Sequence, residues 1–77
     1  MTDLEKRLLN ILKAVLENDQ LDDTVSQDTC EGWDSLHHLQ LIVALEDEFD
    51  VILEPDEIAA MRDFKTVLSI LHQKGLE

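Results

Sequence analysis

Apolar residues recur at helical spacing along a chain of only 77 residues. In the N-terminal part they form one stripe, made of Leu4, Leu8, Ile11, Leu12 and Val15. This spacing of i, i+4, i+7, i+8 and i+11 is typical of a helix with one buried face. The 14 leucines also favour helices over sheets. The pattern predicts a first helix over residues 3–17, which Thr2 and Glu5 begin as a capping box.

The rest of the chain predicts three more helices. The second begins at Asp34 or Ser35 and ends near Phe49, the short third follows Pro55, and the fourth covers residues 66–74 with Gly75 as its C-terminal cap. We expect these helices to bury Ile42, Leu45, Phe49, Ile58, Met61, Val67, Ile70 and Leu71, with Leu39 and Leu41 beside the core and His38 on its rim. Residues 18–33 have no helical period and predict a long loop anchored by Val25. The fold class is therefore all-α: a four-helix bundle with a long first loop and a short third helix, in a single domain over residues 1–77.

Charge and size exclude several kinds of function. Eighteen acids against six bases give a net charge of −12, which repels nucleic acid and anionic lipid and favours a basic protein partner. So short a chain has no room for a catalytic cleft, so we do not expect an enzyme. No apolar run approaches the roughly 18 residues that span a membrane, and the single cysteine, Cys30, cannot form an internal disulfide. We expect a cytoplasmic monomer that neither binds nucleic acid nor inserts into membranes.

The most informative segment is Gly32-Trp33-Asp34-Ser35-Leu36. A serine at the start of a helix exposes its hydroxyl beside unpaired backbone N–H groups, at the positive end of the helix dipole. A phosphate joined to Ser35 would be stabilised by the same groups. Taken alone, Asp34 or Ser35 is more often only an N-cap.

The wider context of Ser35 resembles the acyl carrier protein family. The likeness lies in Asp-Ser-Leu opening the helix, an aliphatic run, and the ending Ala-Leu-Glu-Asp-Glu-Phe-Asp over residues 44–50. The preceding Gly-Trp is similar to the entry of discrete carriers. The resemblance implies that Ser35, next to Asp34, carries a covalent 4′-phosphopantetheine group that a phosphopantetheinyl transferase donates from coenzyme A. Its thiol would hold acyl groups as thioesters and carry them between enzymes.

A second stripe of the same helix, made of Leu36, Gln40, Val43 and Asp47, lies more than about 90° from its core face. It matches the face that this family presents to its partners. With Glu46, Glu48 and Asp50 it would meet acyl-loading and acyl-transfer enzymes through basic docking patches. His37 and Gln40 stand where carriers of fatty acid synthesis usually have acids. These departures favour a dedicated carrier of a specialised lipid or secondary-metabolite pathway, while Asp34 favours acyl cargo without excluding an aminoacyl group.

Other readings stay open beside this one. The chain could be a carrier-like adaptor that is never modified and acts by binding proteins through the second helix, or a small acidic regulator in which Ser35 is only a cap. His37, His38 and His72 do not have the spacing of a metal site, so we expect no metal. The acids around Cys30 should keep its thiol protonated and unreactive.

Overall fold

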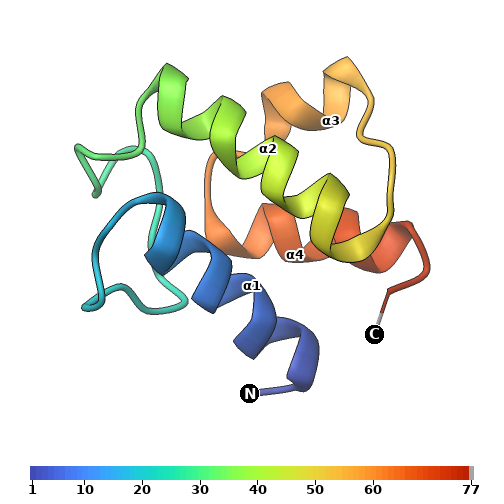
Figure 1. The fold of residues 1–77 in the computed structure, drawn as a ribbon, viewed down its shortest axis with the longest axis horizontal. Helices are drawn as coiled ribbons and strands as arrows, with labels where there is room; N and C mark the ends of the chain where they lie inside the picture. Colours follow the sequence, from blue (N-terminus) through green and yellow to red (C-terminus); the bar gives the residue numbers. More distant parts are fainter. Residues whose placement is uncertain (77) are drawn as a thin grey trace.

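The computed structural model describes residues 1–76, which form four helices and no strand. The helices are α1 (Asp3–Val15), α2 (Ser35–Phe49), α3 (Pro55–Ala60) and α4 (Phe64–Gln73). α1 and α2 lie side by side and run in opposite directions, α4 packs against α1, and the short α3 contacts α4 (Figure 1). The expected all-α fold, with its long first loop and short third helix, is confirmed.

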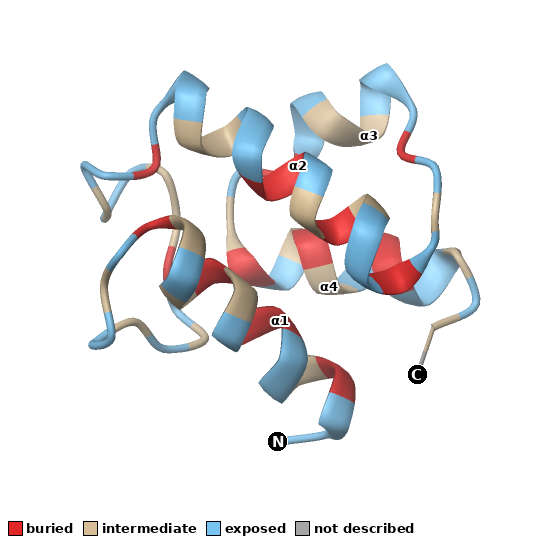
Figure 2. Cartoon of the chain, in the orientation of Figure 1, coloured by how far each residue is buried: buried red, intermediate tan, exposed pale blue. Residues whose placement is uncertain are grey.

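The helices turn their apolar faces toward one another and form one core (Figure 2). Residues fully removed from solvent include Leu8 and Leu12 of α1, Leu41 and Leu45 of α2, and Leu71 of α4. The buried stripe of α1 differs slightly from the expected one. It includes Leu9 and is continued by Leu16, the C-cap residue, whereas Ile11 and Val15 are only partly buried. Leu39, expected beside the core, is 61% exposed, so that expectation was wrong.

Two helix ends differ from the sequence prediction because of local backbone geometry. α1 ends at Val15 rather than residue 17, since Glu17 adopts a left-handed conformation with φ of 53°. The N–H of Asn18 then donates to the carbonyl of Lys13 at 3.0 Å, which closes the helix in a Schellman motif. α4 begins at Phe64, two residues before the expected start, because the Asp63 carboxylate accepts the N–H of Thr66 at 2.8 Å.

The long loop between α1 and α2 is held by two buried side chains and by backbone hydrogen bonds to the segment around the start of α4. Its anchors are Val25, as expected, and Trp33, which are 5% and 3% exposed. The loop also forms two backbone hydrogen bonds with the segment where the link after α3 meets α4. The N–H of Gln27 donates to the carbonyl oxygen of Arg62 at 2.8 Å, and the N–H of Phe64 donates to the carbonyl oxygen of Val25 at 3.0 Å. These two bonds hold the loop in place, and the loop ends directly before the start of α2.

The two faces of α2 should respond differently to truncation. Leu45 is fully buried whereas Val43 is 66% exposed. We expect Leu45→Ala to lower the free energy of unfolding by about 2–5 kcal/mol, because it leaves a cavity in the core. Val43→Ala should change the same free energy by no more than about 0.5 kcal/mol. Urea unfolding followed by circular dichroism measures both, and equal losses would contradict this orientation of α2.

Candidate functional site

Ser35 is the first residue of α2 and is exposed. Asp34 precedes it as the N-cap, with the extended backbone that this position requires. The N–H groups of the first helical turn have no acceptor within the helix, and together they carry about half a positive charge. The hydroxyl of Ser35 therefore faces solvent where the helix favours an anion.

The Asp34 carboxylate is held by the residue one turn further along. Its Oδ1 atom accepts the N–H of His37 at 2.9 Å and lies 2.7 Å from the ring Nδ1 of the same residue. Both hydrogen bonds lower the pKa of Asp34 below its ordinary value of 3.8, and the bond from the backbone N–H has the larger effect. The negative charge of Asp34 therefore interacts with the first turn of α2, and these hydrogen bonds partly compensate it beside Ser35.

His38 joins three segments that meet behind Ser35. Its Nδ1 accepts the indole N–H of Trp33 at 3.0 Å, and its Nε2 lies 2.8 Å from the carbonyl oxygen of Ile58 in α3. A carbonyl can only accept, so the hydrogen of this imidazole is on Nε2. His38 lies on the rim of the core, as expected, and the structure adds that it connects the loop and α3 through α2.

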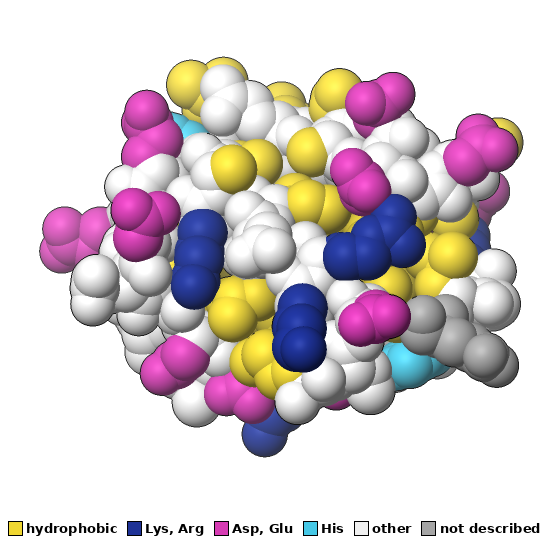
Figure 3. All heavy atoms as spheres, turned by 60° about the horizontal axis from the view of Figure 1, so that its bottom comes forward, with side chains coloured by type: hydrophobic (Ala, Val, Ile, Leu, Met, Phe, Trp, Pro, Cys, Tyr) yellow, Lys and Arg dark blue, Asp and Glu magenta, His cyan; other side chains and the backbone are white. Residues whose placement is uncertain are grey.

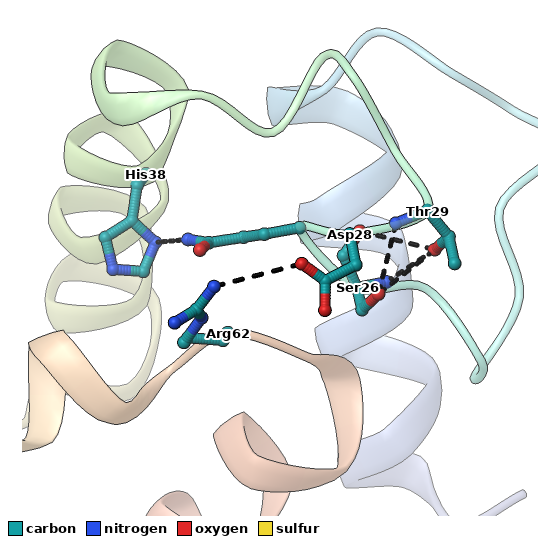
Figure 4. Close-up of polar contacts among 6 residues, drawn as sticks. Ser26, Asp28, Thr29, His38 and Arg62 are labelled. Carbon is teal, nitrogen blue, oxygen red and sulfur yellow. Dashed lines mark hydrogen bonds and ion pairs between the residues drawn. The ribbon is translucent and has the colours of Figure 1, made fainter.

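The loop side of His38 carries further polar groups. The Nε2 of Gln27 approaches the same Nδ1 at 3.5 Å (Figure 4). Arg62 points toward the loop, where its guanidinium is 3.8 Å from the carboxylate of Asp28. This is an exposed and loose ion pair, which contributes little to stability.

Two open hollows flank this network. The first, of about 370 Å³, is lined by Ser35 together with Trp33, His38 and Leu39. The second, of about 410 Å³, lies toward α3 and shares His38 with the first. A flexible arm attached at the exposed hydroxyl of Ser35 therefore fits this site: it could extend into solvent or lie along the hollows, without displacing core residues.

The outward side of α2 is apolar over most of its length. Leu36, Leu39 and Val43 are 62%, 61% and 66% exposed. We name as the α2 face the six residues that line a shallow hollow of about 490 Å³: Leu36, Leu39, Gln40, Val43, Ala44 and Asp47. Four of them were expected from the sequence, and Leu39 and Ala44 were missed. At about 100° per residue, Leu39 lies about 100° from the centre of the observed buried face, so a wheel centred on Leu45 would have found it.

Glu46, expected among the partner-binding residues, has another contact. It is half-buried, and its Oε2 accepts the N–H of Leu53 at 3.0 Å in the link to α3. The neighbouring Glu48 pairs with Arg7 of α1 at 2.7 Å, and Arg7 also lies over the ring of Phe49 at 4.6 Å. The structure thus brings Leu36, Gln40, Val43 and Asp47 together but directs Glu46 toward Leu53.

Within residues 1–76 no three His, Cys, Asp or Glu side chains are placed to hold a metal ion. None of the helices in this range has the length and apolar content needed to cross a membrane. Trp33 is a packing residue rather than an exposed contact, being 3% exposed.

His38 should matter for stability in a way that its neighbours do not. We expect His38→Ala to lower the free energy of unfolding by about 1–3 kcal/mol, because the N–H of Trp33 and the carbonyl of Ile58 lose their partner. Trp33 is the single tryptophan, so its fluorescence reports the change directly. The exposed neighbour Leu39 supplies the control, since Leu39→Ala should leave both stability and emission nearly unchanged. A His38→Ala protein with the stability of Leu39→Ala would refute this role.

The carboxylate caps predict a stability that falls in acid. Hydrogen bonds hold the pKa values of Asp34 and Asp63 below 3.8 in the folded protein, so folding favours their ionised forms. This contribution is complete above the pKa of the unfolded state and is lost as the pH falls through the lower pKa of the folded state. Asp34→Asn keeps a capping oxygen but cannot titrate, so its urea midpoint should fall less than that of the unchanged protein between about pH 6 and about pH 2.5. Equal falls would show that Asp34 contributes nothing to the pH dependence.

The comparisons with known proteins agree with this geometry. A family model described as the phosphopantetheine attachment site matches residues 6–72 and therefore includes the loop, Ser35 and the α2 face. No curated protein matched the chain. A domain of this family is where 4′-phosphopantetheine is covalently attached. It interacts with a phosphopantetheinyl transferase and with acyl-handling enzymes, and it does not catalyse reactions itself. The chain therefore belongs to the phosphopantetheine-binding family of carrier proteins, to which acyl carrier proteins belong.

Proposed function

We propose that Ser35 is the residue that carries 4′-phosphopantetheine, and that the protein is an acyl carrier of a dedicated biosynthetic pathway. The observation that carries this proposal is the place of Ser35: an exposed hydroxyl on the first residue of α2, beside an open hollow and inside the matched region. When bound, the group supplies a thiol that can hold acyl cargo as a thioester.

The surroundings of Ser35 suit its modification. In the transferase, the Ser35 oxygen would bond to phosphorus of coenzyme A while its proton passes to a base of that enzyme and the nucleotide part leaves. Positioning and charge neutralisation are the main requirements of such a transfer. Asp34 holds the helix start open toward solvent, and the first-turn N–H groups of α2 favour the phosphate that results. The carrier supplies an accessible, well-held hydroxyl, and the transferase supplies the catalytic groups.

The chemistry of α2 supports a dedicated pathway. Residues 35–45 contain no Asp or Glu, so the part of the helix next to Ser35 offers no acid to a basic partner. The family's carriers in fatty acid synthesis usually have acids there. We therefore favour partners of its own, with acyl rather than aminoacyl cargo because Asp34 precedes the serine. The protein would act in the cytoplasm as a monomer.

The second candidate is a carrier-like adaptor that is never modified. The observation that favours it is the apolar α2 face itself, which could bind a partner whether or not Ser35 is loaded. The two functions differ in one chemical step, which can be measured.

The test is the intact mass after incubation with coenzyme A, magnesium and a broad-specificity phosphopantetheinyl transferase. We expect the protein to gain one phosphopantetheine, and Ser35→Ala to gain none while remaining folded by circular dichroism. Ser69 is another exposed serine, in α4, so Ser69→Ala should be loaded like the unchanged protein. A folded protein that gains no mass would favour the adaptor, and loading of Ser35→Ala would place the attachment elsewhere.

A further inference from the structure

The two hollows that flank the network of His38 share a polar wall. Gln27 of the long loop and His38 of α2 line both of them. The first hollow is also lined by Ser35, and the second by Arg62 in the link after α3. The apolar side of the second hollow consists of three residues of α3, namely Pro55, Ile58 and Ala59. The surface beside Ser35 therefore continues past His38 to a hollow that has an apolar side and a cation.

The side-chain amide of Gln27 has donor capacity that the fold does not fully use. Its Nε2 atom lies 3.5 Å from Nδ1 of His38 (Figure 4), whereas the indole N–H of Trp33 reaches the same nitrogen at 3.0 Å. This nitrogen of a neutral imidazole has one lone pair, and the shorter bond occupies it. At 3.5 Å the contact of the amide is at the limit of hydrogen-bonding distance. The hydrogens of the Gln27 amide are therefore only weakly bound and can be donated to another acceptor.

The guanidinium of Arg62 is also weakly engaged. Within residues 1–76 its ion-pair partner is Asp28, whose carboxylate lies 3.8 Å away, beyond the usual length of a hydrogen bond. The side chains of this pair are 66% and 87% exposed, so water and salt screen their attraction. Arg62 projects toward the contact between the loop and His38 (Figure 4), and it lines the same hollow as Gln27. Two weakly bound donor groups thus face one hollow.

The other Lys and Arg residues lie elsewhere. Three of the six are in α1, and one of these, Arg7, pairs with an acid of α2. Lys74 pairs with an acid of α3, and Lys65 lines a separate hollow at the start of α4. Several cations on the lower side of the molecule stand among acids (Figure 3). Of the cations in the described part of the chain, Arg62 is therefore the one that lines the hollows beside Ser35.

We propose that the second hollow receives acyl cargo that carries a carboxylate, and that Arg62 and Gln27 bind this carboxylate. A planar guanidinium can donate two parallel hydrogen bonds to a carboxylate, and the amide of Gln27 can donate a further one. The methylene groups of such a cargo would lie against the apolar residues of α3. The inference rests on the proposed attachment at Ser35 and deepens it, because it specifies the chemical class of the cargo.

Attachment at Ser35 is what makes so exposed a site effective. The net charge of −12 repels a free anion, and one exposed ion pair is weak on its own. A cargo joined to Ser35 binds within the same molecule, at an effective concentration on the order of millimolar. The other anion of the loaded protein, the phosphate, would be fixed to Ser35 beside the first-turn N–H groups of α2. The carboxylate of the cargo is thus the anion that is free to reach Arg62.

The test compares two cargoes of equal length that differ by one carboxylate. A broad-specificity phosphopantetheinyl transferase loads the isotope-labelled protein from glutaryl-coenzyme A or from pentanoyl-coenzyme A, and the intact mass verifies each loading. NMR then follows the side-chain N–H signals of Gln27 and Arg62, with the protein loaded from plain coenzyme A as reference. We expect the glutaryl form to shift these signals at least about threefold more than the pentanoyl form. This excess should fall by at least about half between about 0.05 M and about 0.5 M salt.

Three results would overturn the proposal, and each has a different cause. Equal shifts in the glutaryl and pentanoyl forms would show that the carboxylate is not recognised. If plain coenzyme A shifted the two signals of the unloaded protein as far as glutaryl-coenzyme A does, the arm itself would occupy the hollow. An unchanged mass of the folded protein would refute the attachment at Ser35, and only this result would count against the proposed function.

Variants test the role of Arg62 against that of positive charge in general. Arg62→Gln should remove at least about two-thirds of the excess shift of the Gln27 signal in the glutaryl form. Lys65→Gln also removes one exposed cation, but outside the two hollows, and should leave this excess unchanged. Asp28→Asn removes the competing carboxylate and should enlarge it. Circular dichroism verifies that each variant is folded. An excess that survives Arg62→Gln, or that falls equally in Lys65→Gln, would refute the role of Arg62.

Discussion

The hydrogen bond between the indole of Trp33 and the imidazole of His38 joins the end of the long loop to the beginning of α2. Trp33 is buried, so its N–H needs an acceptor, and Nδ1 of His38 supplies one at 3.0 Å. The opposite nitrogen of the same ring contacts Ile58 of α3. One side chain thus connects the end of the loop, the first turn of α2 and α3. Ser35 lies beside this junction, two residues after Trp33.

The short helix α3 is held differently from the other helices. None of its residues 55–60 is buried, and its firm contacts are the Ile58 carbonyl with His38 and the ion pair of Glu57 with Lys74 at 2.7 Å. On either side of α3 the chain is anchored in the core, by Leu53 before the helix and by Met61 after it. An element with few buried apolar contacts opens at lower free energy than the core around it. The hollow beside α3 therefore has the most adaptable wall of the site.

The acidic side chains of the molecule fall into two groups, those that accept hydrogen bonds within the fold and those that face solvent. Several carboxylates make hydrogen bonds within the fold: Asp34 and Asp63 cap helices, and Glu46 holds the link after α2. Many others stay in solvent and give the chain its strong negative charge. The acids of this chain are thus divided between bonds within the fold and charges exposed to solvent.

The sequence by itself determined the four helices, the capping box at Thr2, the exposed serine after Asp34 and most of the α2 face. These features are local: helical periodicity and capping residues act over a few positions, so they can be recognised along the chain. Tertiary structure decided the bond that turns Glu46 toward Leu53. It also decided the meeting of Trp33, His38 and Ile58 and the pairing of the loop with the link before α4. Those contacts join residues up to 39 positions apart, as in the bond from Phe64 to Val25, or depend on which face of a helix the whole core buries, and no short stretch of sequence specifies them.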